Sequence, residues 1–297
     1  MSDVLPGGTL RLSETLTVTR VGYGALQLAG PMAYGPPRDR DEALAVLRAA
    51  VEAGITHLDT SDYYGPQLVN GLVREALHPF REALHPFREG LHIATKVGAR
   101  RTAERGWPAA LSRPELIQAV HDNLDHLGLE ALDLVNLRMT DTLAADDIVE
   151  PFTVLAELRD QGLIRDLGVS NVSAEQVEAA RHIAPVVAMQ NHYNVAFRQD
   201  DALVDRCAEQ GIAFVPFWPL GGFRPLQARA LEQVAAELAV TARQIALAWL
   251  LHRSPTMLLI PGTSTRAHLA ENIAAATIGL SAETLRTLDA IAGPAAA

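Results

Sequence analysis

The sequence is short of cysteine, of basic residues and of long apolar runs, and each shortage excludes a class of protein. Its single cysteine, Cys207, rules out an internal disulfide framework and fits a reducing compartment. Lys and Arg number 25 against 35 Asp and Glu, so the net charge is −10 at pH 7. A chain this acidic is not expected to bind nucleic acid or an anionic membrane surface.

Apolar segments are all too short for a membrane span, which needs roughly 18 residues. The opening residues, MSDVLPGGTLRLSE, have neither the basic start nor the apolar core of an export signal. We therefore expect a cytoplasmic protein with no membrane partner.

The glycine fingerprint G-x-G-x-x-G of dinucleotide-binding sheets is missing as well. The nearest stretch, GYGALQ at residues 22–27, lacks the third glycine and does not lead directly into a helix. A Rossmann domain is therefore not expected.

Short apolar segments and segments of helical spacing alternate through most of the chain. An N-terminal stretch, residues 7–24, predicts a small β-hairpin followed by a strand that ends near Gly22. Further strands are expected at 55–59, 91–96, 131–137, 164–170, 186–190, 212–217 and 256–261. Helices are expected at 41–54, 67–77, 112–128, 147–162, 173–183, 201–211, 225–239, 241–253, 266–276 and 283–291.

Eight apolar strands, each followed by at least one helix, favour a closed (β/α)8 TIM barrel over an open doubly wound sheet. No long linker divides the chain, and 48% of its residues are hydrophobic. We expect one α/β domain over residues 1–297, with the N-terminal hairpin and extra C-terminal helices. Polar residues fall at or just past the carboxyl ends of the strands, where such barrels carry their active sites. These residues are Asp59, Lys96, Arg138, Asn171, Gln190 and Thr263.

The segment DTSDYYG, residues 59–65, has the strongest chemical content. Asp59 ends an apolar run, Tyr64 follows within the same loop, and Lys96 ends the next predicted strand. A phenol can donate a proton near neutral pH if a cation lowers its pKa, so Lys96 is the candidate cation. Taken singly, these residues could instead be a helix cap, a packing tyrosine and a solvated lysine.

One feature is peculiar to this chain: REALHPF occurs twice in succession, at residues 74–80 and 81–87. Its place between a helix and the next strand predicts a surface duplication far from the chemistry. A binding role for the repeated His-Pro-Phe is the alternative.

Six motifs in order resemble the aldo-keto reductase superfamily. They are D-T-x-x-x-Y-G at 59–65, the strand-end Lys96, GVSN at 168–171, Gln190 with YN after it, FWPLGG at 217–222, and IPGTS at 260–264 followed by EN. Within the superfamily, VGYGALQLAGP, LDLVNLR and IPGTSTRAHLAEN look closest to the bacterial branch that includes pyridoxal reductases.

The resemblance implies a barrel that binds NADPH across its carboxyl-end face and reduces a small-molecule aldehyde or ketone without a metal. Tyr64 would be the general acid, and Lys96, paired with Asp59, would lower its pKa. The cofactor-binding residues would be Gly24, Ser170, Asn171, Gln190, Phe217, Pro219, Leu220, Gly262, Thr263, Ser264, Arg266, His268, Glu271 and Asn272.

Within that set the implied roles differ. Ser170, Asn171 and Gln190 would hold the nicotinamide carboxamide, and Phe217 would stack on its ring. Residues 262–264 open a predicted helix and so form an anion site, Arg266 would bind the 2′-phosphate, and Glu271 with Asn272 would contact adenine.

This chain departs from the family pattern at four positions. Phe217 stands where a Tyr is usual, and the aromatic face for stacking is kept. Gly262 stands where a Lys is common, and His268 where a phosphate-binding Arg is common. Arg138 takes the place of the usual active-site His, and a guanidinium cannot release its proton at physiological pH. NADPH is still favoured over NADH.

Two functions therefore remain open. One is reduction of a carbonyl substrate, with pyridoxal as the preferred candidate, because Arg138 could bind its ring oxygen. The other is an NADP(H)-holding binding or sensing protein in which Arg138 has ended useful turnover. Schiff-base chemistry on Lys96 needs a free amine, which pairing with Asp59 disfavours. The oligomeric state stays open.

Overall fold

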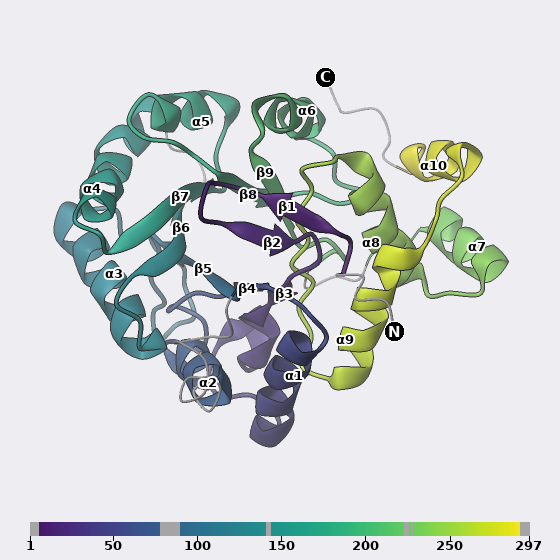
Figure 1. Cartoon of the computed structure of the whole chain (residues 1–297), viewed down its shortest axis with the longest axis horizontal. Helices are drawn as coiled ribbons and strands as arrows, with labels where there is room; N and C mark the ends of the chain where they lie inside the picture. The colour runs from purple at the N-terminus through teal and green to yellow at the C-terminus, as the bar shows by residue number, and fades with distance from the viewer. Residues whose placement is uncertain (1–5, 78–89, 141–143, 223–225, 227, 292–297) are drawn as a thin grey trace.

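The computed structural model describes residues 6–77, 90–140, 144–222, 226 and 228–291. Seven parallel strands form one sheet in chain order, and neighbours along the chain are neighbours in the sheet (Figure 1). They are β3 (Tyr23–Gly24), β4 (His57–Asp59), β5 (His92–Val97), β6 (Leu132–Arg138), β7 (Ile164–Ser170), β8 (Ala188–His192) and β9 (Ala213–Phe217).

The eighth strand position is filled by residues 257–262, which lie between β9 and β3. They form isolated parallel bridges, with Met257 opposite Phe214, Leu259 opposite Val21, and Gly262 opposite Gly24. This segment pairs with β9 near its start and with β3 nearer its end, so no continuous ladder forms. The expected (β/α)8 barrel is confirmed, with this segment as its seam.

The first barrel strand, β3, ends at Gly24, two residues beyond the predicted end near Gly22. At the seam, Gly24 is in close backbone contact with the last segment of the barrel. A Cβ added to Gly24 would lie 2.4 Å from the carbonyl oxygen of Ile260. Glycine is thus required where the last segment of the barrel meets the first.

Within the described residues, ten α-helices surround the strands or follow them (Figure 1). They are α1 (Arg40–Glu52), α2 (Leu68–Leu77), α3 (Arg113–Leu127), α4 (Val149–Asp160), α5 (Ala174–Arg181), α6 (Asp201–Gln210), α7 (Arg229–Leu238), α8 (Ala242–Arg253), α9 (Arg266–Ala274) and α10 (Ala282–Asp289). Several start at a capping box; in α8 the Thr241 and Gln244 side chains bond each other's backbone N–H groups.

That residues 1–297 form a single domain remains a prediction. Residues 78–87 of the duplication lie outside the described residues, so its placement on the surface remains a prediction as well.

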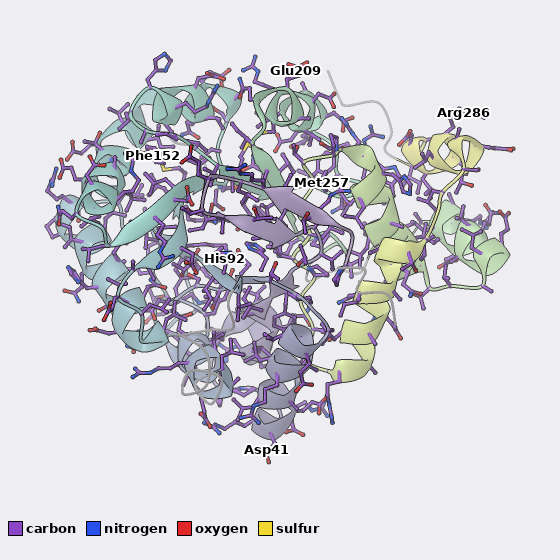
Figure 2. All side chains as sticks on the ribbon, viewed as in Figure 1. Asp41, His92, Phe152, Glu209, Met257 and Arg286 are labelled. Atoms are coloured by element: carbon purple, nitrogen blue, oxygen red, sulfur yellow. The ribbon has the colours of Figure 1, made fainter. Side chains whose placement is uncertain are left out.

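Two layers of apolar packing hold the barrel. The larger lies between the strands and the helices, and includes Phe152 of α4 and Trp249 of α8. The smaller fills the barrel's interior, where Leu16 and Val18 of the hairpin β1 (Thr9–Arg11) and β2 (Thr17–Thr19) pack on inward-facing strand residues. Charged side chains such as Asp41, Glu209 and Arg286 lie at the rim (Figure 2).

Across the described part of the chain, no single helix is long and apolar enough to cross a membrane. The pair α7 and α8 reaches the length only together, and the two helices are bent by 96° at the break between them.

His57, the first residue of β4, is buried inside the barrel with 2% of its surface exposed. Burial lowers the pKa of His57 to about 4. The unfolded chain binds this proton below its ordinary pKa of about 6.5, so stability is expected to fall as the pH drops from about 6.5 towards 4, by roughly 3 kcal/mol in all.

Urea unfolding at pH 7 and pH 5 would measure this. In His57→Gln the loss of stability between the two pH values should shrink, whereas the exposed His182→Gln should leave it unchanged. An equal pH dependence in wild type and His57→Gln would show that other groups cause the acid instability.

Candidate active site

The carboxyl ends of the parallel strands bring the predicted chemical residues together. Asp59 ends β4, Lys96 lies at the penultimate position of β5, and Arg138 ends β6. All three line a cavity of about 390 Å³. The other residues expected at a cofactor site that line it are Gly24, Asn171, Gln190, Phe217, Pro219, Leu220 and Gly262.

Lys96 and Asp59 form a buried ion pair at the base of this cavity. Lys96 Nζ lies 2.6 Å from Asp59 Oδ1, and both side chains are 4% exposed. Lys96 also donates to the carbonyl of Thr60 at 3.1 Å, and Gln190 donates through Nε2 to Asp59 Oδ2 at 2.9 Å. Each charge therefore has a partner, as burial demands. A fixed cation beside the cavity suits a reaction in which an oxyanion develops.

Tyr64 is held in the loop after β4 by a tight turn. Its backbone N–H bonds to the carbonyl of Ser61, and Gly65 follows with φ of +87°. The ring is 7% exposed and lines the cavity, and Lys96 Nζ lies 5.3 Å from its centroid. Within the described residues its hydroxyl makes no hydrogen bond, so it is available to a ligand in the cavity.

The sequence predicted that the pKa of Tyr64 is lowered, and this prediction was wrong, because the pKa is raised. Burial raises the pKa of Tyr64 above its ordinary value, and the Asp59 carboxylate raises it further. The Arg138 guanidinium opposes the increase but does not overcome it. A phenol with a raised pKa keeps its proton at neutral pH, and only a protonated phenol can act as an acid.

Arg138 is held by contacts with the ends of β7 and β9. Its Nη1 donates to Ser170 Oγ at 3.2 Å, and its Cζ lies 4.8 Å from the centre of the Phe217 ring. Ser170 is fully buried and is not among the residues that line the cavity. Its role at the carboxamide stays a prediction, because its hydroxyl accepts from Arg138 and keeps its own proton to donate. The alternative partner for Arg138, Asp141, lies outside the described residues.

The site fits the amide of a nicotinamide ring. Gln190 is 1% exposed, and its Oε1 is buried with no hydrogen-bond partner in the part of the chain that the structure describes. Such an acceptor suits the N–H2 of a carboxamide. Asn171, on the neighbouring strand end, has a φ of +58° and donates through Nδ2 to the carbonyl of Met139. Phe217 offers an aromatic face to the same cavity.

Of the residues assigned to the adenosine end, Gly262 lines the cavity and the others lie away from it, on and before α9. The residues outside its lining are Thr263, Ser264, Arg266, His268, Glu271 and Asn272. Thr263 is buried and accepts from the N–H of Thr265, the cap of α9. Arg266 is exposed and pairs with Glu42 of α1, its Nη2 lying 3.0 Å from Glu42 Oε2. The sequence analysis did not anticipate this pair.

Aromatic residues that the sequence analysis gave no role form much of the cavity wall. Tyr63, Trp107 and Trp218 all line it, and Trp107 meets the Tyr63 ring edge to face. Trp218 has a φ of +56° and meets the Phe217 ring at 88°. For Tyr63 and Trp218 a signal was available, because each is next to a predicted site residue within the motifs DTSDYYG and FWPLGG. The other unassigned wall residues are Leu26, Gln27, Ala99, Met139, Thr140, Gly222, Ile260 and Pro261.

A parallel barrel with a buried Lys–Asp pair beside a tyrosine, at the carboxyl ends of its strands, has the arrangement expected of a carbonyl-reducing enzyme. Residues 20–292 match the family model described as Aldo/keto reductase family. The chain therefore belongs to the aldo/keto reductase family and is an oxidoreductase that acts on a small-molecule carbonyl or alcohol.

Relatives and solved structures agree with this assignment. The chain is 53% identical over 281 residues to pyridoxine 4-dehydrogenase of Escherichia coli, covering 93% of this chain and 96% of that protein. It is 36% identical over 288 residues to an uncharacterized oxidoreductase of Schizosaccharomyces pombe, covering 97% and 90%. A thermostable aldo-keto reductase crystallised with the inhibitor epalrestat has a TM-score of 0.79 at 30% identity, covering 95% and 99%.

Proposed function

We propose that this protein interconverts pyridoxal and pyridoxine with NADPH or NADP⁺ as the hydride carrier. The observation that carries the proposal is the 53% identity to pyridoxine 4-dehydrogenase over nearly the whole of both chains. The cavity supports it, because aromatic walls suit a planar ring and Arg138 stands beside them.

In this proposal each residue of the site has a separate task. The nicotinamide, when bound, supplies the hydride. Gln190 holds its carboxamide, and Phe217 covers its ring. Tyr64 gives its hydroxyl proton to the carbonyl oxygen, at which negative charge develops. Lys96, which its ion pair with Asp59 holds in place at 2.6 Å, stabilises that charge.

Arg138 is the residue that would select pyridoxal. The ring 3-oxygen of pyridoxal lies next to the aldehyde and is ionised over much of the neutral range. A guanidinium can bind such an oxygen through two donors. Its position against Ser170 and Phe217 holds the planar fork at the cavity wall.

The direct test follows NADPH absorbance with pyridoxal as substrate and identifies the product by chromatography. Turnover to pyridoxine supports the proposal. Tight NADPH binding with no turnover of pyridoxal or of a panel of aldehydes would favour the alternative, a protein that holds NADP(H) for binding or sensing.

The role of Arg138 has its own test. Arg138→Met should raise the KM for pyridoxal by about tenfold or more, since a charge-assisted contact is worth about 1.5–3 kcal/mol. The KM for 3-deoxypyridoxal, which lacks only the 3-oxygen of pyridoxal, should change little. Arg138→His should partly restore turnover of this simpler aldehyde. Equal losses for both aldehydes would mean that Arg138 acts on Tyr64 or on the fold.

A further inference from the structure

Glu42 and Arg266 make a contact with more bonds than a simple surface ion pair. Glu42 Oε1 accepts from the Arg266 backbone N–H at 3.0 Å and from Nε at 3.2 Å. Glu42 Oε2 accepts from Nη2 at 3.0 Å and from Nε at 3.2 Å. The Glu42 carboxylate therefore accepts hydrogen bonds from both the Arg266 guanidinium and the first backbone N–H of α9.

These donors are the ones an external anion would use. Arg266 is the first residue of α9, so its N–H points out of the helix start, where partial positive charge gathers. The Arg266 side chain adds a full charge, and contact with Glu42 raises the pKa of Arg266 further. Glu42 occupies the donor set that the 2′-phosphate of NADPH would need.

Glu42 is itself held in place from α1. Its backbone N–H donates to the Asp39 carboxylate, which caps that helix, at 3.0 Å. Its side chain is 25% exposed against 63% for Arg266. The carboxylate is thus the more fixed member of the pair, and Arg266 the one that is free to move towards a ligand.

We propose that Glu42 sets the cofactor selectivity of this protein by competing with the 2′-phosphate for Arg266. The proposal rests on the proposed function and on the expectation from the family resemblance that Arg266 binds that phosphate. NADPH must displace the guanidinium from Glu42 and place a phosphate near a fixed carboxylate. NADH carries a 2′-hydroxyl instead, and a carboxylate can accept a hydrogen bond from it. Glu42 therefore narrows the preference for NADPH and lets the protein use NADH.

Competition of this kind is physically feasible because the existing pair is weak. Exposed ion pairs contribute little to stability, so Arg266 can be released at small cost. A guanidinium binds phosphate through two charge-assisted hydrogen bonds. The simpler reading is that the pair only ties α1 to α9 across the seam of the barrel, and in that case its loss would alter stability and leave selectivity unchanged.

Fluorescence titrations of the full chain would separate these readings. The ligands are NADPH, NADH, adenosine 2′,5′-bisphosphate and AMP, and the variant is Glu42→Gln. Removing the negative charge should tighten NADPH and adenosine 2′,5′-bisphosphate by about tenfold, or about 1.4 kcal/mol. NADH and AMP should bind equally or more weakly.

A matched control is available on the other side of the barrel. Arg113 of α3 and Glu157 of α4 form a similar exposed pair between helices, at 2.7 and 2.8 Å. Glu157→Gln should change stability as much as Glu42→Gln and change no ligand's Kd. In an Arg266→Ala background, which itself should weaken NADPH more than NADH, Glu42→Gln should no longer alter the NADPH to NADH ratio.

Two results would overturn the inference. One is an unchanged Kd ratio of adenosine 2′,5′-bisphosphate to AMP in Glu42→Gln. The other is a ratio that changes as much in the Arg266→Ala background as in the wild type. Failure of the proposed function looks different: wild-type protein would then show no pyridoxal turnover, whatever Glu42→Gln does to nucleotide binding.

Discussion

Tyr64→Phe is expected to lose roughly 10²–10⁴-fold in kcat, the usual contribution of a positioned acid, while it binds NADPH almost as tightly as the wild type. The substitution removes only a hydroxyl that makes no hydrogen bond within the described residues, and it keeps the ring that packs at the cavity wall. Stopped-flow turnover with pyridoxal and a fluorescence titration of NADPH would measure the two effects separately.

Tyr63→Phe is the matched control. Tyr63 is the adjacent residue, lines the same cavity, and meets the Tyr64 ring edge to face at 5.4 Å between centroids. Burial raises the pKa of Tyr63 to about 12, so both phenols keep their protons at neutral pH. We expect Tyr63→Phe to retain most of its kcat. If Tyr63→Phe instead lost as much kcat as Tyr64→Phe, the assignment of the general acid to Tyr64 and not to Tyr63 would no longer hold.

The grouping of Asp59, Lys96 and Arg138 at one cavity could be predicted because it follows from topology. Once the chain is read as a parallel barrel, residues at the carboxyl ends of successive strands must meet at one face. The positions of Asp59, Lys96 and Arg138 follow once the ends of their strands are known. The error of about two residues at the end of the first strand did not change these positions. The same rule places Gln190 at this face, where it contacts Asp59, a residue 131 positions earlier in the chain.

What the sequence could not supply depends on side-chain packing. The direction of the Tyr64 pKa is set by how deeply the ring is buried, which periodicity does not reveal. The Glu42–Arg266 pair joins residues 224 positions apart and exists because α1 and α9 lie side by side at the seam (Figure 1). The hydrogen bond from Arg138 to Ser170, 32 residues later in the chain, likewise depends on side-chain packing.

The second large effect concerns the buried ion pair. Lys96→Met is expected to cost about 3–5 kcal/mol of folding stability, because it leaves the Asp59 carboxylate buried without its cation. Asp59→Asn should cost a similar amount, since it leaves the Lys96 ammonium buried without an opposite charge. Both variants should also be catalytically inactive. Urea unfolding and a turnover assay on the folded protein would measure these losses.

The double variant Asp59→Asn/Lys96→Met separates stability from catalysis. With both charges removed, no uncompensated ion is buried, so most of the lost stability should return. Activity should not return, because no fixed cation remains beside the reacting oxygen. A double variant as unstable as either single one would show that packing, and not burial of a lone charge, causes the loss. A stable double variant with wild-type turnover would remove the Lys96–Asp59 pair from the mechanism, and the positive potential at Tyr64 would then have to come from Arg138.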